Sequence, residues 1–321
     1  MTKNKTEGLR REKGKGIAGP AGWTLLAFLL LIPANLFGQM ASPLTIDENA
    51  RLSAYASSSY QFKSNLDGGG DVSIARYGIG VGGAMPLSDR FGLGVRVTYD
   101  REEYNFSNAL GFAASNPWNQ INRLGLGMRL GYRLTDQWSV GGGPMVQYAG
   151  ENGASFSDAL MYGGIVSALY RANPDFMIGF GAGVFYRLEE TRVFPSLIIS
   201  WKINDRLRLG NSYRLGPTGP AGLELSYKLD GNWEVAAGGG HRSSRFRLDK
   251  DGSTPGGIGE NRSWPIYARL SRKLGSALHL DLYGGAAFGG EMKLQDSGGR
   301  DINSVNYNTT PLMGINLRTI F

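Results

Sequence analysis

A histidine and a serine two positions apart could together perform hydrolytic chemistry. In the run His241-Arg242-Ser243, both side chains would lie on one face of an extended strand. An imidazole beside a hydroxyl can act as base and nucleophile. Catalysis by such a pair also requires a third residue that orients the histidine. No clear candidate fills that role, although Asn261 can be proposed. The motif is therefore incomplete as catalytic machinery.

The same pair resembles the His-x-Ser motif of outer-membrane phospholipase A. That family continues with Asn-Gly after the serine, whereas Ser244 and Arg245 follow here. The resemblance implies a lipid hydrolase that uses His241 and Ser243. We keep this as the least favoured of three functional hypotheses, and we expect no enzyme.

Other chemical signals in the sequence are weak. The chain has no cysteine, which excludes disulfides, thiol catalysis and thiolate metal ligands. Asp249, Asp251 and Glu260 bracket a loop, and their carboxylates suit calcium, but their spacing does not match a full calcium loop. A solvated acidic loop is favoured, with calcium binding left open. Three Gly-Gly-Gly runs lack the strand–loop–helix context of phosphate loops. We therefore predict no catalytic residue, no metal site and no cofactor.

Segments in which apolar and polar residues alternate recur along the chain. They include residues 91–99, 124–134, 176–188, 206–215 and 222–229. A period of two is typical of strands with one apolar and one polar face. The polar face is rich in arginine and glycine, and we expect its glycines to relieve crowding, permit bending or admit a neighbouring arginine or tyrosine.

Aromatic residues at the ends of the apolar faces favour a membrane barrel over a soluble sandwich. Trp138 and Tyr148 share a face about ten residues apart, and so do Phe176 and Tyr186. Ten residues of about 3.3 Å, tilted by about 40°, rise about 25 Å, the height of the apolar band of an outer-membrane barrel. We predict a lipid-facing girdle made of Phe91, Tyr99, Trp138, Tyr148, Phe176, Tyr186, Trp201, Trp233 and Phe321.

Connections between the strands alternate between short and long. Six tight turns are predicted at 87–90, 134–137, 173–175, 204–206, 230–232 and 274–277. Seven longer links are predicted near 63–70, 104–120, 149–157, 188–192, 216–219, 248–261 and 292–308. This pattern predicts an all-β transmembrane antiparallel barrel of about 14 strands, with short periplasmic turns and longer outer loops. Twelve strands is the alternative if a hairpin is misread.

The N-terminal residues predict a cleaved signal peptide. A segment with six Lys and Arg residues precedes the apolar run 23–37, and the small residue Gly38 follows. The run has about fifteen residues, whereas a membrane-spanning helix needs about 20. An uncleaved anchor is the alternative. We expect residues 1–38 to be the signal peptide and residues 39–321 to be the barrel.

Removal of the signal changes the charge of the protein. The whole chain has 34 Lys+Arg and 27 Asp+Glu, a net charge of +7. The first 38 residues carry six of these bases and two of the acids, which leaves 28 against 25. Part of the positive net charge therefore belongs to the predicted signal peptide, and the net charge does not indicate a nucleic-acid partner.

The stretch "FRLDKDGSTPGGIGENRSWPIYARLS", residues 246–271, resembles a family of bacterial outer-membrane β-barrels of unknown function. FRLD, a glycine-rich loop ending GxGE, and a strand ending ARLS recur in that family. The resemblance implies a barrel in the cell outer membrane of a Gram-negative bacterium, and it implies no activity. The last strand, 314–321, ends on an aromatic residue and resembles the assembly signal of such barrels. It implies the barrel-assembly machinery and the lipid bilayer as partners.

The polar faces of the strands predict the lining of the lumen. The predicted lining residues are Arg96, Arg129, Arg133, Arg187, Arg206, Arg208, Arg214, Glu224, Lys228, Arg269 and Arg318. Each arginine would cost about 2–4 kcal/mol at the lipid midplane, which fixes the register. Arg206 and Arg214 beside Glu224 are the expected ionic network. The leading hypothesis is a narrow passive pore or solute channel with a net basic lumen, and a structural or surface-interaction barrel with a plugged lumen is the alternative. The sequence does not indicate the solute.

Overall fold

Antiparallel strands make up nearly all the regular structure. The computed structural model describes residues 50–108, 110–211, 217 and 222–321. The strands are β1 (Arg51–Asn65), β2 (Asp71–Pro86), β3 (Phe91–Ser107), β4 (Gln120–Arg133), β5 (Trp138–Glu151), β6 (Leu160–Asn173), β7 (Phe176–Arg187), β8 (Thr191–Lys202), β9 (Leu207–Asn211), β10 (Gly222–Lys228), β11 (Trp233–Gly240), β12 (Arg242–Arg247), β13 (Ile258–Leu274), β14 (Leu278–Gln295), β15 (Asp301–Tyr307) and β16 (Thr310–Ile320). A short 3-10 helix, η2 (Gly111–Ser115), lies between β3 and β4. Among these residues no helix has the length and apolar character needed to cross a membrane.

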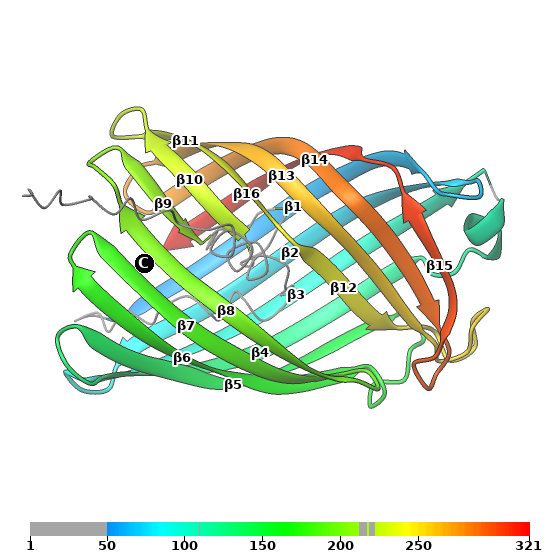
Figure 1. Cartoon of the computed structure of the whole chain (residues 1–321), viewed down its shortest axis with the longest axis horizontal. Helices are drawn as coiled ribbons and strands as arrows, with labels where there is room; N and C mark the ends of the chain where they lie inside the picture. Colours follow the sequence, from blue (N-terminus) through cyan, green and yellow to red (C-terminus); the bar gives the residue numbers. More distant parts are fainter. Residues whose placement is uncertain (1–49, 109, 212–216, 218–221) are drawn as a thin grey trace, which may run out of the picture.

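The strands form one sheet that closes into a barrel (Figure 1). β11 and β12 are halves of one long strand, because both pair with β13. β15 and β16 are likewise halves of the strand that pairs with β14. The barrel closes between β1 and β16, whose register runs from Ser53↔Ile320 to Gln61↔Leu312. The prediction of a 14-strand antiparallel barrel is confirmed.

The connection between β7 and β8 differs from its prediction. A longer link was expected at 188–192, but β7 ends at Arg187 and β8 begins at Thr191. The turn is tight, because the Arg187 N–H donates to the Glu190 carbonyl at 2.7 Å. Leu188 and Glu189 both have positive φ, 53° and 67°. A two-residue hairpin of this kind requires positive φ at both central positions and normally uses Asn or Gly there. The Leu188 side chain is fully buried, which holds the turn in place.

Side chains alternate across the barrel wall as the period of two requires. On β2 the outward residues Tyr77, Ile79 and Val81 are 48–59% exposed. The inward position Gly80 lies under the ring of Tyr55, and a Cβ at Gly80 would be 2.4 Å from the Tyr55 ring. The glycine therefore makes room for the inward tyrosine of the neighbouring strand, as expected.

Candidate functional site in the barrel interior

Strand β12 stays paired with β13 and is buried in the barrel interior. Its continuation β11 pairs with β10 as far as Gly240. Beyond that point β12 keeps β13 as its wall neighbour, and its other edge reaches β5 through a parallel bridge between Arg247 and Gly150. β5 and β12 are not neighbours in the sheet order, so this bridge joins distant parts of the wall through the lumen.

The composition of β12 suits an interior strand. Its residues Arg242–Arg247 are buried or half-buried, although charged or polar side chains occupy both faces. Arg245 donates to the backbone carbonyls of Arg187 and Leu188 at 3.0 and 2.9 Å. Arg247 donates to three backbone carbonyls of the outer loops at 2.9–3.1 Å. A strand with polar groups on both faces cannot face lipid, and its hydrogen bonds are instead made inside the barrel.

A buried carboxylate ties β12 to the opposite wall. Glu102, on β3, is 2% exposed. Five side chains contact its oxygens: Arg76, Arg123, Arg242, Tyr104 and Ser244. The ion pairs from Arg123 and Arg242 are both 2.9 Å, and Arg76 Nε lies at 3.8 Å. Three guanidinium groups from β2, β4 and β12 thus share one carboxylate, and we call these six residues the Glu102 cluster.

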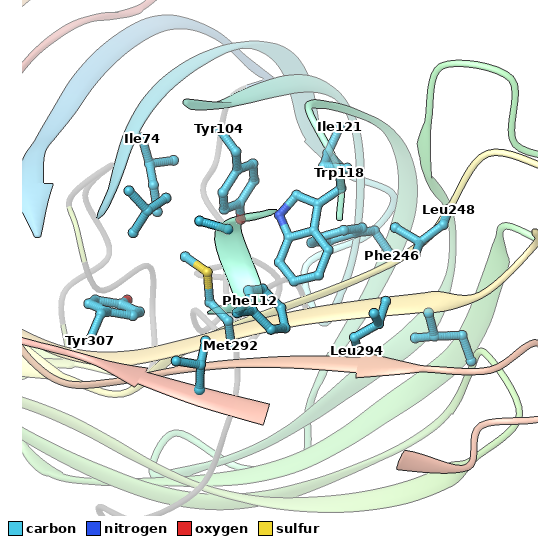
Figure 2. Packing of buried hydrophobic residues seen from close by; sticks show 14 of the residues in the cluster. Ile74, Tyr104, Phe112, Trp118, Ile121, Phe246, Leu248, Met292, Leu294 and Tyr307 are labelled. Atoms are coloured by element: carbon cyan, nitrogen blue, oxygen red, sulfur yellow. The ribbon is translucent and has the colours of Figure 1, made fainter. Parts of the chain in front are cut away.

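Apolar side chains fill the outer part of the lumen (Figure 2). Trp118, from the link between β3 and β4, is 1% exposed, and its ring centroid lies 5.5 Å from Phe112 and 5.3 Å from Phe246. Strands around the wall add further buried residues: Ile74, Ile121, Met161, Ile258, Met292 and Val305. We call this set the outer apolar cluster. Close apolar packing excludes hydrated solutes from the space that it occupies.

A second ionic cluster lies beside the β7–β8 turn. Glu260, on β13, accepts two hydrogen bonds of 2.8 Å from Arg262. Glu190, in the turn, accepts two from Arg192 at 3.0 and 2.9 Å. Arg245 lies 3.5 Å from Glu260 and 3.8 Å from Glu190, so it bridges the two carboxylates.

A third network lies nearer the end with the short turns. Arg269, on β13, pairs with Glu224 at 2.5 Å, with Glu234 at 3.0 Å and with Asp281 at 3.4 Å. The expected partnership of Glu224 with Arg206 was wrong, because Arg206 is exposed and contacts the Tyr227 hydroxyl at 3.4 Å. The other expected partner, Arg214, lies outside the described residues, and so does the predicted link at 216–219.

The predicted lumen residues differ in how far their side chains are buried. Arg187, Glu224 and Arg269 are buried. Arg96, Arg129 and Arg318 are half-buried, and the exposed members are Arg133, Arg206, Arg208 and Lys228. On β3 and β4 the register sets Arg96 opposite Gly127 and Gly94 opposite Arg129. Each arginine therefore has a glycine as its cross-strand neighbour, and the role of these residues in conduction stays a prediction.

The predicted girdle residues alternate with the inward positions of their strands. Tyr99, Trp138, Trp201 and Phe321 are 40–73% exposed. The half-buried members are Phe91, Tyr148, Phe176, Tyr186 and Trp233. Neighbouring aromatic rings cover part of this surface, as between Trp138 and Tyr170, whose centroids are 5.0 Å apart. Contact of the girdle with lipid stays a prediction.

The His241–Ser243 pair does not form a nucleophile and base. Ser243 is fully buried and donates to Glu260 at 2.8 Å. The His241 ring packs edge-on against Trp264 with centroids 4.7 Å apart, and its Nδ1 is buried without a hydrogen-bond partner. Asn261 is hydrogen-bonded to two tyrosine hydroxyls at 3.3 and 3.0 Å. This geometry gives no support to the hydrolase hypothesis.

The three carboxylates weighed for calcium have separate partners. Asp249 accepts the Asp251 N–H at 3.0 Å, and Asp251 pairs with Lys250 at 2.6 Å. Glu260 is held by arginines inside the barrel. In the part of the chain that the structure describes, no group of three or more His, Cys, Asp or Glu could hold a metal ion.

Sequence reasoning missed Glu102 and the interior position of β12. The usable signal was the run "RSSRFR", residues 242–247, because its polar residues occupy both faces. Phe112 and Trp118 were also missed, since they lie in a link that was expected only to connect two strands.

A closed antiparallel barrel with an apolar exterior and a charged interior defines an outer-membrane β-barrel protein, and the protein is located in the outer membrane. A Pseudomonas aeruginosa FadL homologue has this fold, with a TM-score of 0.51 and 15% identity over 91% of this chain and 95% of that chain. The Ralstonia pickettii toluene transporter TbuX gives a TM-score of 0.42 at 10% identity, over 88% and 93%. The P. putida toluene transporter TodX gives 0.41 at 9%, over 92% and 94%.

Residues 89–318 match the family described as domain of unknown function DUF6268, and the chain belongs to this family. The expectation of an outer-membrane barrel family of unknown function, based on residues 246–271, is confirmed. No curated protein matches the chain.

Proposed function

We propose that the protein is a narrow outer-membrane channel with a net basic lumen. The observation that carries the proposal is the charge of the inward positions between the Glu102 cluster and the short turns. Basic side chains at these positions include Arg96, Arg129, Arg133, Arg208, Lys228, Arg269, Lys273 and Arg318. The acidic ones are Asp100, Glu224, Glu234 and Asp281. A surplus of positive charge within low-dielectric walls favours anions.

A plugged structural barrel is the second candidate. The outer apolar cluster and the Glu102 cluster both favour it, because they hold β12 inside the lumen with buried contacts. Conductance separates the two candidates. We propose no enzymatic activity, because Ser243 donates to Glu260 rather than to His241.

In planar bilayers, we expect single-channel conductance with a weak preference for anions. The variant Arg129→Glu/Arg208→Glu should shift the reversal potential in a KCl gradient toward cation preference, because both side chains face inward. Lys250→Glu, in an exposed outer loop, makes the matched charge change and should leave selectivity unaltered. Cation preference in the unmodified protein, or unchanged selectivity in the double variant, would defeat the basic-lumen proposal. Absence of any conductance would favour the plugged barrel.

We also propose that residues 1–38 are a cleaved signal peptide, and that the C-terminal strand is read by the barrel-assembly machinery. Residues 1–49 lie outside the described part of the chain. N-terminal sequencing of protein from isolated outer membranes should begin near Gln39. A sequence that still starts within residues 1–30 would contradict the cleavage.

A further inference from the structure

Arg187 is a buried cation without an ionic partner. It is the last residue of β7, faces inward and is 3% exposed. Its Nε is buried without a hydrogen-bond partner. In the described part of the chain its guanidinium makes no hydrogen bond and no ion pair, and it lies over the face of Phe194, 5.5 Å from the ring centroid.

The carboxylates near Arg187 are engaged by other arginines. Glu260 and Glu190 act on Arg187 electrostatically. Glu260 is occupied by Arg262, and Glu190 by Arg192, each through two hydrogen bonds. Removing an arginine from water without a paired anion is costly, so buried charges in proteins are normally paired. Arg187 departs from this rule.

The backbone next to Arg187 is strained and firmly held. Leu188 and Glu189 follow it with positive φ, a conformation that costs non-glycine residues free energy and that often occurs at functional sites. Arg245 donates to the carbonyls of Arg187 and Leu188, which fixes the turn. The Arg187 side chain is thereby positioned before any ligand arrives.

The wall beside Arg187 is apolar. Phe185 and Phe194 pack together there, and Met145 and Ile165 pack against them. An anion that keeps a full hydration shell suits such surroundings poorly. An anion with one charged group and an apolar body suits them well.

We propose that Arg187 forms the charged end of a binding site for a small organic carboxylate with an apolar body. The carboxylate accepts two parallel hydrogen bonds from the Arg187 guanidinium. The apolar body lies against the Phe185–Phe194 wall. A role of this site in transport depends on the proposed channel function. Binding of the carboxylate does not depend on it.

The test uses the whole barrel in non-ionic detergent micelles and benzoate as the probe. Isothermal titration calorimetry should show saturable binding at one site per barrel. Benzamide, which has the same shape without the charge, should bind at least about ten-fold more weakly, because a charge-assisted hydrogen bond is roughly twice as strong as a neutral one. Equal binding of benzamide would overturn the carboxylate requirement. Equal or tighter binding of chloride or phosphate would show an inorganic-anion site and overturn the apolar part of the proposal.

Variants locate the site on the barrel. Arg187→Gln should weaken benzoate binding about ten- to hundred-fold. Arg101→Gln, on the outward face of β3, makes the same chemical change at an exposed residue and should leave binding unaltered. Unchanged binding in Arg187→Gln would overturn the proposal.

Stability separates a binding role from a structural one. Arg187→Met should unfold at the same urea concentration as the unmodified barrel or at a higher one, because it removes an unpaired buried charge. A lower urea midpoint would identify Arg187 as a structural residue and overturn the proposal. Benzoate binding without conductance would support the binding site and contradict the channel. Conductance without benzoate binding would support the channel and contradict the binding site.

Discussion

Glu102→Gln is expected to lower the free energy of unfolding by about 3–5 kcal/mol, because it breaks a buried ion-pair network on one side only. Arg123 and Arg242 each lose an ion pair of 2.9 Å, and Arg76 loses one of 3.8 Å. The glutamine keeps the shape of the side chain, so the effect reports the charge. Urea titration in micelles, followed by the mobility of unboiled samples on gels, measures the change.

Glu103→Gln is the matched control for this substitution. Glu103 is the next residue on β3, points outward and pairs with Arg101, and the two side chains are 39% and 40% exposed. Exposed ion pairs contribute at most about 1 kcal/mol, so the control should change stability little. Equal losses in the two variants would contradict the central role of the Glu102 cluster.

Phe246→Ala is expected to cost about 3–5 kcal/mol, because it leaves a cavity where a fully buried aromatic ring stood. The ring lies 5.3 Å from Trp118 and 6.0 Å from Tyr104, between centroids, and the Arg123 guanidinium lies 5.9 Å from its centre. Gly259 on β13 provides the space for the ring, since a Cβ there would be 2.3 Å from it. The same urea titration measures the loss.

Phe156→Ala tests whether the loss reflects burial. Phe156 lies between β5 and β6, is 65% exposed and stacks on Tyr148 with centroids 5.4 Å apart. Its removal should change stability by about 0.5 kcal/mol or less. Phe246→Leu should recover part of the loss in Phe246→Ala, and a full loss in the leucine variant would point to a specific requirement for the ring.

The wall of the barrel was predictable because lipid imposes a simple rule on it. Every second residue must be apolar, and charged residues are costly on the outer face, so segments such as 91–99 and 124–134 reveal both their structure and their orientation. Short turns such as 134–137 then separate the strands. The count of fourteen followed from these local signals.

The interior was harder to predict because no local rule governs it. Inside the wall, a residue is placed by partners that are distant in the sequence, as Arg242 is by Glu102. The expected pairing of Glu224 with Arg206 failed for this reason, since cross-strand partners depend on a register that alternation leaves undefined. The tight turn at Leu188 and Glu189 was hidden because neither residue is typical of positive φ.

The interior course of β12 has a consequence for the order in which the protein folds. Its ion pair with Glu102 joins residues 140 positions apart, and the hydrogen bond from Arg123 to Ser244 spans 121. Contacts of such long range form late, because the intervening chain must first be ordered. The first five strands would therefore serve as a template on which β12 docks. The pairing of β1 with β16 spans still more of the chain, from Ser53 to Ile320, so closure of the barrel would follow the docking of β12.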